Sequence, residues 1–343
     1  MRSAILSSFA LCLLSIGINL SSQQRIPPKP ISEDDVIRVE SNLVTLPVKV
    51  SSHGNIVTGL RREQFQVFEN GIEQEIVYFE SPDGPRIEEP NVRPLTIALM
   101  LDVSDSTEFK LAKIKTAALT FIDLLQPEDG VLVVAFDNTV QVLVERTSDR
   151  YVLRRGVNAL HTGTGTSLYQ ALNEVIGKRL AHVSGRKAIV LLTDGVDTTS
   201  KSVSIDDVVR TAETSDVAIY PVQYDTYADF SDNPSRETYG VGNLGAVSHV
   251  TRNGESVSEA YKRATRYLRI LAEKTAGHFQ YADNSKSLAK SFDTIARQLR
   301  EHYTVGYYPT DKTEGLRKIE IRIKDSAKLN VQTRRSYVYK SLK

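Results

Sequence analysis

The stretch LTIALML at residues 95–101, followed directly by DVSDS at residues 102–106, decides the fold. A run of strand length that is almost entirely apolar predicts a strand buried on both faces, as in the interior of a parallel sheet. The acidic and hydroxyl residues that follow would then lie at the carboxyl end of the strand. In open α/β sheets this edge is where ligands bind.

Residues 95–302 continue with apolar runs that alternate with segments of helical periodicity. Further strands are expected at 131–136, 187–193, 217–222 and 278–281, with an antiparallel edge strand at 139–144. Helices are expected at 108–125, 149–159, 168–180, 204–214, 260–275 and 285–300. The alternation predicts an α/β fold with a doubly wound, mostly parallel sheet.

The segments on both sides of this region have the two-residue alternation of β-strands. Residues 39–80 contain Asn70-Gly71, a strong hairpin signal, and residues 303–341 are again rich in strand formers. Because neither end has enough strands to bury a core alone, we expect both to form one smaller β-sandwich into which the α/β domain is inserted. Residues 81–94 would be a linker.

Residues 225–257 form a long polar stretch without a period. Such a stretch is too long for an ordinary connection within a compact domain. We interpret it as an insertion or lid in the α/β domain.

The first residues have the pattern of a secretory signal peptide over residues 1–23. Arg2 precedes an uncharged apolar run from Ala4 to Ile18, and cleavage is expected within 20–24. The run is short for a bilayer span, so an uncleaved anchor is the weaker alternative. A proline-rich linker over 24–38 would follow. We therefore expect an exported protein, periplasmic or secreted, with no stable membrane span after cleavage.

The charge balance and the cysteine content exclude several classes of protein. The 343 residues carry 43 Lys and Arg against 42 Asp and Glu, so no basic field attracts nucleic acid. The single cysteine, Cys12, lies in the predicted signal peptide. The mature chain would then have no disulfide and no cysteine metal site.

Three separated segments place oxygen-bearing side chains at strand ends or helix starts. They are DVSDS at 102–106, GTGTS at 163–167 and TDGVD at 193–197. Carboxylates and hydroxyls without histidine or cysteine suit a small hard cation, which we expect to be Mg²⁺, with Mn²⁺ or Ca²⁺ as alternatives. Since hydroxyl ligands are neutral, the bound metal would keep a positive charge and attract a further carboxylate.

The three segments together resemble the metal-ion-dependent adhesion site of von Willebrand factor A (VWA) domains. The five matching positions are Asp102, Ser104, Ser106, Thr166 and Asp194. The resemblance implies that the serines bind the metal directly, that the aspartates act largely through water, and that the threonine engages when ligand is bound. It also implies a protein partner that presents an Asp or Glu carboxylate. Asp105 departs from the pattern, since relatives often have glycine there.

The flanking segments resemble, more loosely, an exported VWFA-related group of acidobacterial proteins. The residues that carry this likeness are Phe65–Val67, Gly71, Gln74, Ile76, Tyr303–Pro309 and Arg317. Short β patterns of this kind recur in many proteins. The likeness adds the expectation of an exported bacterial protein.

Two alternatives to a binding module follow from the same residues. An Asp-led loop after a strand also resembles Mg²⁺-dependent phosphoryl-transfer hydrolases of the haloacid dehalogenase type. These need an acid two residues after the first Asp, where this chain has Ser104, so we expect no enzyme. The other alternative is a structural envelope protein with a non-functional site. Asp137, Asn138 and Asp197 are interpreted as turn and capping residues.

Overall fold

The computed structural model describes residues 43–82, 95–183, 185–224, 255–324 and 328–339. The chain divides into two units, residues 1–41 and 42–343. The predicted signal peptide at 1–23 and the linker at 24–38 lie outside the described residues. So do nearly all of the linker at 81–94 and most of the insertion at 225–257.

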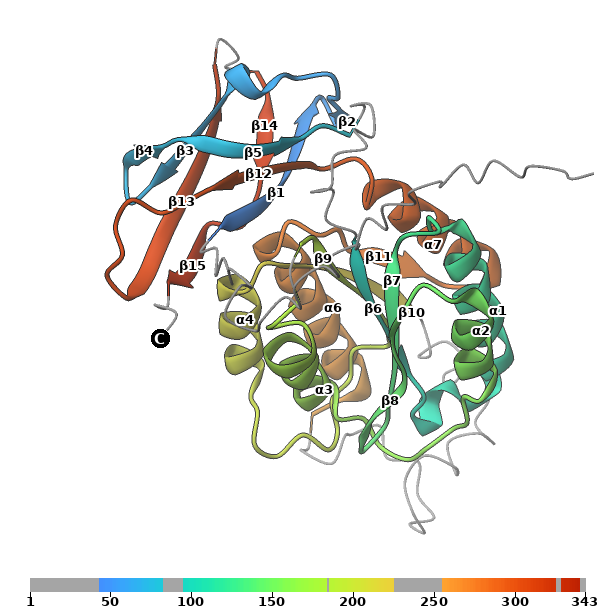
Figure 1. Cartoon of the computed structure of the whole chain (residues 1–343). Helices are drawn as coiled ribbons and strands as arrows, with labels where there is room; N and C mark the ends of the chain where they lie inside the picture. Colours follow the sequence, from blue (N-terminus) through green and yellow to red (C-terminus); the bar gives the residue numbers. More distant parts are fainter. Residues whose placement is uncertain (1–42, 83–94, 184, 225–254, 325–327, 340–343) are drawn as a thin grey trace, which may run out of the picture. The chain divides into compact units, whose positions relative to one another are not determined.

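A six-stranded sheet forms the centre of the α/β part, in the order β11-β10-β9-β6-β7-β8 (Figure 1). Its strands are β6 (Thr96–Asp102), β7 (Gly130–Phe136), β8 (Val140–Thr147), β9 (Lys187–Thr193), β10 (Val217–Tyr224) and β11 (Gln280–Ala282). Every neighbouring pair is parallel except β7 and β8, which are antiparallel. The expected mostly parallel sheet with an antiparallel edge strand is therefore confirmed.

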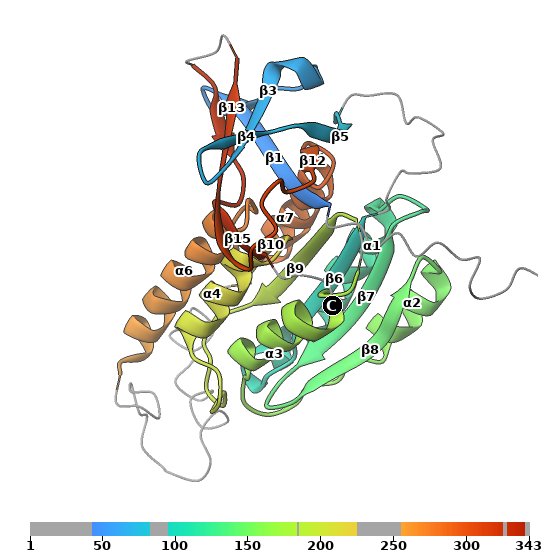
Figure 2. The ribbon, with the colours of Figure 1, turned by 60° about the vertical axis from the view of Figure 1, so that its left-hand side comes forward.

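Helices cover both faces of this sheet, as Figure 1 shows. One hydrophobic core lies between the sheet and α1 (Leu111–Leu124), α2 (Arg150–Asn158) and α7 (Ser285–Gln298). The other lies between the sheet and α3 (Leu168–Glu174), α4 (Ile205–Thr214) and α6 (Val257–Lys274). Figure 2 shows α4 and α6 running alongside each other. The apolar residues of β6 are buried on both sides because helices pack on both faces.

Three predicted helix boundaries differ from the structure. The helix expected from 108 begins as a 3-10 turn at Asp105–Lys110, and the one expected at 168–180 ends in a π turn at Val175–Arg179. Helix α6 begins at Val257, although the insertion was predicted to extend to 257. The reason is a capping box. The Glu259 backbone N–H donates to the Ser256 hydroxyl, and that hydroxyl donates to the Glu259 carboxylate.

Strands from both ends of the described chain pair with one another in two antiparallel sheets. The first contains β14 (Asn330–Gln332), β1 (Val44–Ser52), β12 (Tyr303–Tyr307), β5 (Ile76–Glu80) and β2 (Asn55–Ile56). The second contains β15 (Ser336–Tyr339), β13 (Gly315–Ile323), β3 (Phe65–Glu69) and β4 (Ile72–Gln74). The inner faces of both sheets share one hydrophobic core, so the two sheets form a sandwich.

The hairpin between β3 and β4 turns at the predicted dipeptide. Asn70 and Gly71 have φ of 50° and 83°, the left-handed conformations that a two-residue hairpin requires. Glu69 and Ile72 are the paired residues on either side. No helix within the described ranges combines the length and hydrophobicity needed to cross a membrane.

Candidate metal centre

Asp102 is the last residue of β6, and its side chain is completely buried. Its Oδ1 accepts hydrogen bonds from the Ser104 backbone N–H at 3.1 Å and from the Ser104 hydroxyl at 2.6 Å. Its Oδ2 accepts one from the Thr193 hydroxyl at 2.6 Å. The first two bonds are a local Asp turn, whereas the third joins the ends of β6 and β9.

Asp194 follows the end of β9 and is also buried. Its Oδ1 accepts a hydrogen bond from the Val196 N–H at 3.0 Å, and its backbone oxygen accepts one from Gln223 Nε2 at 2.9 Å. The Tyr261 hydroxyl of α6 lies 3.4 Å from Oδ2. Asp194 is thereby held by groups from β10 and α6 as well as by its own loop.

The Thr166 loop is bonded to both of the other segments. The Gly163 N–H donates to the Val103 oxygen at 2.8 Å, next to Asp102. The Thr166 N–H donates to the Thr198 hydroxyl at 2.8 Å, and the Thr166 oxygen accepts from the Thr198 N–H at 2.8 Å. The structure therefore brings together the three segments that lie far apart in the sequence.

Two glycines allow this loop to approach its neighbours. A Cβ on Gly163 would lie 1.7 Å from Oδ2 of Asp137, a buried side chain after β7. Gly165 has φ of 68°, a conformation that disfavours other residues. The interpretation of Asp137 as a turn residue is confirmed, since its Oδ1 accepts from the Thr139 N–H at 2.6 Å.

Asp197 has the capping role that the sequence suggested, and it also binds the start of a neighbouring helix. Its Oδ1 accepts from the Ser200 N–H at 3.0 Å, within its own loop. Its Oδ2 also accepts from the Tyr169 N–H at 2.9 Å, in the first turn of α3. Asp197 therefore fixes the start of the helix that follows Thr166.

Ser106 lies in the 3-10 turn at Asp105–Lys110, and its side chain is outside the described part of the structure. Ser104 and Thr166 are buried, like the two aspartates. Four of the five predicted ligand side chains are thus placed within the bonded segments.

The electrostatics at Asp102 are unfavourable for a carboxylate without a cation. Burial, and then the negative charge of Asp194, raise the pKa of Asp102 to about 7, although hydrogen bonds from Ser104 and Thr193 oppose the shift. Within the described ranges no Lys or Arg pairs with Asp102. A buried charge is costly unless it is paired, so a cation placed beside an ionised Asp102 would stabilise it.

The side chains of the site offer the oxygen donors that a hard divalent cation prefers. The described residues contain no group of three or more His, Cys, Asp or Glu side chains placed to hold a metal. The set here has only two carboxylates, and hydroxyls supply its other oxygens. Mg²⁺ accepts such oxygen donors and usually keeps several waters.

Comparison with known families agrees with this geometry. Residues 97–196 match the family model of the von Willebrand factor type A domain. The α/β part of this chain has a VWA-like fold. The matched span runs from β6 past Asp194 and so includes all five predicted ligand positions of the candidate centre. The VWA-like part is called the A domain below.

A curated relative is similar over part of this chain. It is an uncharacterized protein from Synechocystis sp., 32% identical over 106 residues, which is 30% of this chain. The matched region spans about a quarter of that relative, 25% of its length.

Several solved structures are similar at low identity. The vWF domain of the type V pili tip protein Mfa5 from Porphyromonas gingivalis is 14% identical, with a TM-score of 0.44 over 61% of this chain and 95% of that one. A von Willebrand factor type A protein from Catenulispora acidiphila is 13% identical, with a TM-score of 0.44 over 88% of this chain and 75% of that one. Proximal thread matrix protein 1 from the mussel byssus, described with a zinc-occupied MIDAS motif, is 13% identical, with a TM-score of 0.44 over 63% and 48%.

Sequence reasoning missed three residues that hold the aspartates. They are Thr193, Gln223 and Tyr261. Gln223 could have been noticed in the sequence, because it is a polar residue within the largely apolar strand VAIYPVQY. The structure shows that it is buried. Tyr261 could not have been noticed, because a tyrosine on an amphipathic helix is common.

Proposed function

We propose that the A domain is a metal-dependent protein-binding module for adhesion or assembly. Asp102, Ser104, Ser106, Thr166 and Asp194 hold a divalent cation, Mg²⁺ in the first place, with Mn²⁺ or Ca²⁺ as alternatives. The cation in turn accepts an Asp or Glu carboxylate of a protein partner. The observation that carries the proposal is the fully buried Asp102 carboxylate. Its hydrogen-bond donors among the described residues are neutral, and Asp194 is close enough for their charges to repel.

Each residue has a distinct part in this proposal. The Ser104 hydroxyl donates its proton to Asp102, which leaves its lone pairs free for a cation. Ser104, Ser106 and Thr166 are neutral, so two carboxylates leave a divalent ion able to attract one more. The bonds to Thr198 keep the Thr166 loop in place for that ligand. When bound, the cation supplies the positive charge that recognises the partner.

Binding rather than catalysis is the function that these residues favour. A phosphoryl-transfer hydrolase of the type considered above needs a proton carrier two residues after its first Asp. Ser104 stands at that position, and its hydroxyl already donates to Asp102. The second alternative, a structural protein with a non-functional site, gives no reason for burying Asp102 beside a second acid.

The proposed place of action is outside the cytosol, periplasmic or secreted. This rests on the signal-peptide pattern of residues 1–23. The proposed partner is a protein with an accessible Asp or Glu, and not a nucleic acid.

Calorimetry tests metal binding directly. The mature chain should bind Mg²⁺ or Mn²⁺, and Asp102→Ala and Ser104→Ala should each abolish the signal. Asp207→Ala is the control, since Asp207 is an exposed capping carboxylate of α4. The proposal fails if folded wild-type protein binds neither metal, or if both site variants bind like the control.

A pull-down from the native cell envelope tests partner binding. Partners that depend on the cation should be captured by the wild type in Mg²⁺ and lost on adding a chelator. They should also be lost with Ser104→Ala. An unchanged set of captured proteins under all three conditions would contradict the carboxylate grip.

A further inference from the structure

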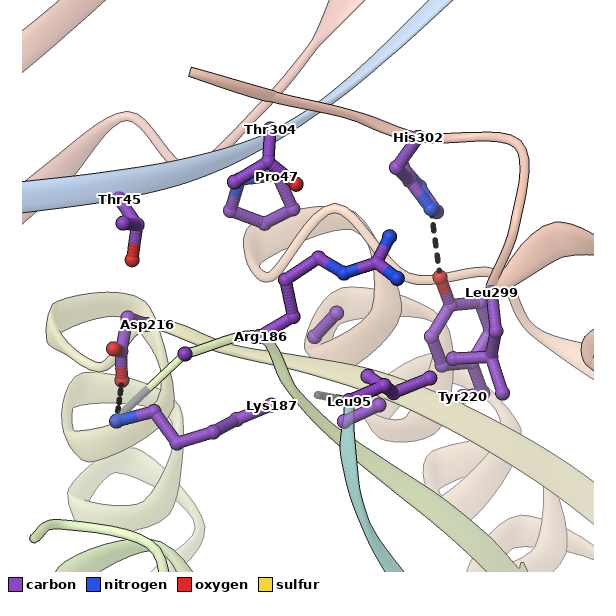
Figure 3. Close-up of a pocket in the computed structure, with 13 residues that line it drawn as sticks. Thr45, Pro47, Leu95, Arg186, Lys187, Asp216, Tyr220, Leu299, His302 and Thr304 are labelled. Carbon is purple, nitrogen blue, oxygen red and sulfur yellow. Dashed lines mark hydrogen bonds and ion pairs between the residues drawn. The ribbon is translucent and has the colours of Figure 1, made fainter. Parts of the chain in front are cut away.

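A small cavity lies at the other edge of the central sheet, where β9 and β10 begin (Figure 3). Its walls come from the A domain, with Arg186, Lys187 and Tyr220, and from the sandwich strands β1 and β12, with Pro47 and Thr304. Its free volume is about 30 Å³. A single water needs about 10–15 Å³ by the same measure, so there is room for two or three waters or one small ion.

Three side-chain polar atoms of residues that line this cavity make no hydrogen bond: the Thr304 hydroxyl, Arg186 Nε and His302 Nε2. The Thr304 hydroxyl belongs to a side chain that is only 2% exposed, and it makes no hydrogen bond. The Nε of Arg186 is likewise buried and unbonded. Figure 3 shows the guanidinium of Arg186 reaching into the space beneath Pro47 and Thr304. Arg186 Nη2 forms an ion pair with Glu80 Oε1 at 3.7 Å, a separation that is too long for a hydrogen bond.

Asp216, the acid among the residues that line the cavity, is already neutralised. Asp216 pairs with the buried Lys187 at 2.6 Å, as the dashed line in Figure 3 marks. Arg334 adds a further buried cation, since its Nη2 donates to the oxygen of Thr45, a lining residue, while its Nε is unbonded. Arg186 and Arg334 therefore each keep a buried Nε without an acceptor, although Glu80 and Asp216 offset part of the positive charge.

His302 also lies in the cavity wall, near the charges of Lys49 and Arg186. Its Nδ1 lies 3.3 Å from the Tyr220 hydroxyl in the cavity wall. Burial, and then the charges of Lys49 and Arg186, lower the pKa of His302 to about 4. Glu301 faces Lys49 and offsets part of that charge. His302 is consequently neutral at pH 7, and it does not contribute an additional cation.

We propose that this cavity binds one small oxyanion, held by the Arg186 guanidinium and the Thr304 hydroxyl. A guanidinium can only donate, so its unused N–H requires an acceptor, and an anionic oxygen is a stronger acceptor than water. Phosphate, sulfate and a carboxylate share this chemistry. Because Arg186 precedes β9 of the A domain and Thr304 lies on β12 of the sandwich, the anion bridges the two.

Titration with simple anions tests the proposal. The metal-free mature chain is titrated by calorimetry with phosphate, sulfate and acetate, each against chloride at equal ionic strength. We expect saturable binding of one oxyanion per chain and a rise in melting temperature, since a ligand that binds only the folded state stabilises it. The ranking of the tetrahedral anions against acetate identifies the preferred class.

Two variants and a control locate the binding. Arg186→Gln should weaken the binding about tenfold or more, and the nearly isosteric Thr304→Val by about threefold. Arg210→Gln, at an exposed arginine of α4, should bind like the wild type. If Arg186→Gln does not fold, the loss in Thr304→Val decides.

Three results would overturn the proposal. One is the absence of saturable binding for all three anions. Another is binding that is the same in Thr304→Val, Arg186→Gln and Arg210→Gln. The third is a crystal structure grown with the tightest-binding anion in which the cavity contains water alone.

Discussion

Asp102 in the A domain and Glu69 in the sandwich are both buried carboxylates at the end of a strand, yet their surroundings differ. Glu69 Oε2 accepts hydrogen bonds from the Tyr307 and Tyr337 hydroxyls, each at 2.7 Å, and Arg317 Nη1 lies 3.7 Å from Oε1. Asp102 has neutral donors and a second acid nearby. The protein thus supplies the counter-charge for Glu69, whereas no Lys or Arg of the described residues pairs with Asp102.

The tyrosines beside Glu69 are reliable donors. Burial first, and then the hydrogen bond to Glu69, raise the pKa of Tyr307 well above its ordinary value, and the same causes raise the pKa of Tyr337. Both hydroxyls therefore stay protonated at any ordinary pH. Arg317 is also bonded to Asp311, which fixes its position beneath the acid. This cluster is complete without a ligand.

The largest expected effect is the loss of Glu69. Glu69→Ala leaves Arg317 and two tyrosine hydroxyls buried without their common acceptor and should lower the free energy of unfolding by about 3–5 kcal/mol. Urea denaturation followed by circular dichroism measures it. Glu320→Ala, an exposed acid on β13, should change the value by less than about 1 kcal/mol. Equal losses of stability in Glu69→Ala and Glu320→Ala would show that the buried cluster around Glu69 contributes no more than an exposed ion pair.

The second prediction concerns Asp102→Asn. In a chelator this variant should be at least as stable as the wild type, because it removes a buried negative charge. Mg²⁺ at a hundred times its dissociation constant should stabilise the wild type by about 2.7 kcal/mol and leave the variant unchanged. Thermal denaturation in both conditions measures the difference. A variant that is strongly destabilised in the chelator would mean that the ionised Asp102 stabilises the fold by itself.

The third prediction is a pH dependence of the metal-free protein. The folded pKa of Asp102, about 7, is above the ordinary aspartate pKa of 3.8, so the folded state binds the extra proton between these two pH values. Stability should accordingly fall as pH rises from about 4 to about 7, by up to 1.4 kcal/mol per unit. Urea denaturation in a chelator at several pH values measures the slope, and Asp102→Asn should reduce it. Identical slopes in both proteins would contradict the shift.

The smallest expected effect is that of Tyr337→Phe, which removes one of the two hydroxyls on Glu69 and leaves the other. The free energy of unfolding should fall by about 1.5 kcal/mol, the usual contribution of a hydrogen bond to a charged group. Tyr308→Phe is the matched control, because the Tyr308 ring is half exposed. No loss in Tyr337→Phe would show that Tyr307 and Arg317 satisfy Glu69 alone.

Much of the fold was predictable because its signals are local. The apolar run 95–101 is β6 nearly to the residue, since a strand buried on both faces has to be apolar throughout. Strand β15 (Ser336–Tyr339) was not predicted, because four residues give no clear alternation. Its inward residues, Tyr337 and Tyr339, are buried only because β13 lies beside them.

The residues of the candidate metal centre could be picked out from the sequence. The residues that hydrogen-bond to them and hold them in place could not. Asp102, Ser104, Thr166 and Asp194 stand in short motifs whose position after strands or before a helix is visible in the sequence. Gln223, Tyr261 and Thr198 act through contacts between distant segments, which no local pattern reveals. The cavity around Arg186 could not be predicted for the same reason, since Thr304 lies more than a hundred residues from Arg186 in the sequence.

The pairing of β1 with β12 has a consequence for synthesis of the chain. Val48 pairs with Tyr303, about 250 residues later, so the first strands leave the ribosome long before their partners exist. At about 5–20 residues per second this interval is roughly 10–50 s. During it the edges of β1 are open to strands of other chains, and a chaperone that holds extended segments would protect them. Moving β1 to the carboxyl terminus by circular permutation would shorten that exposure.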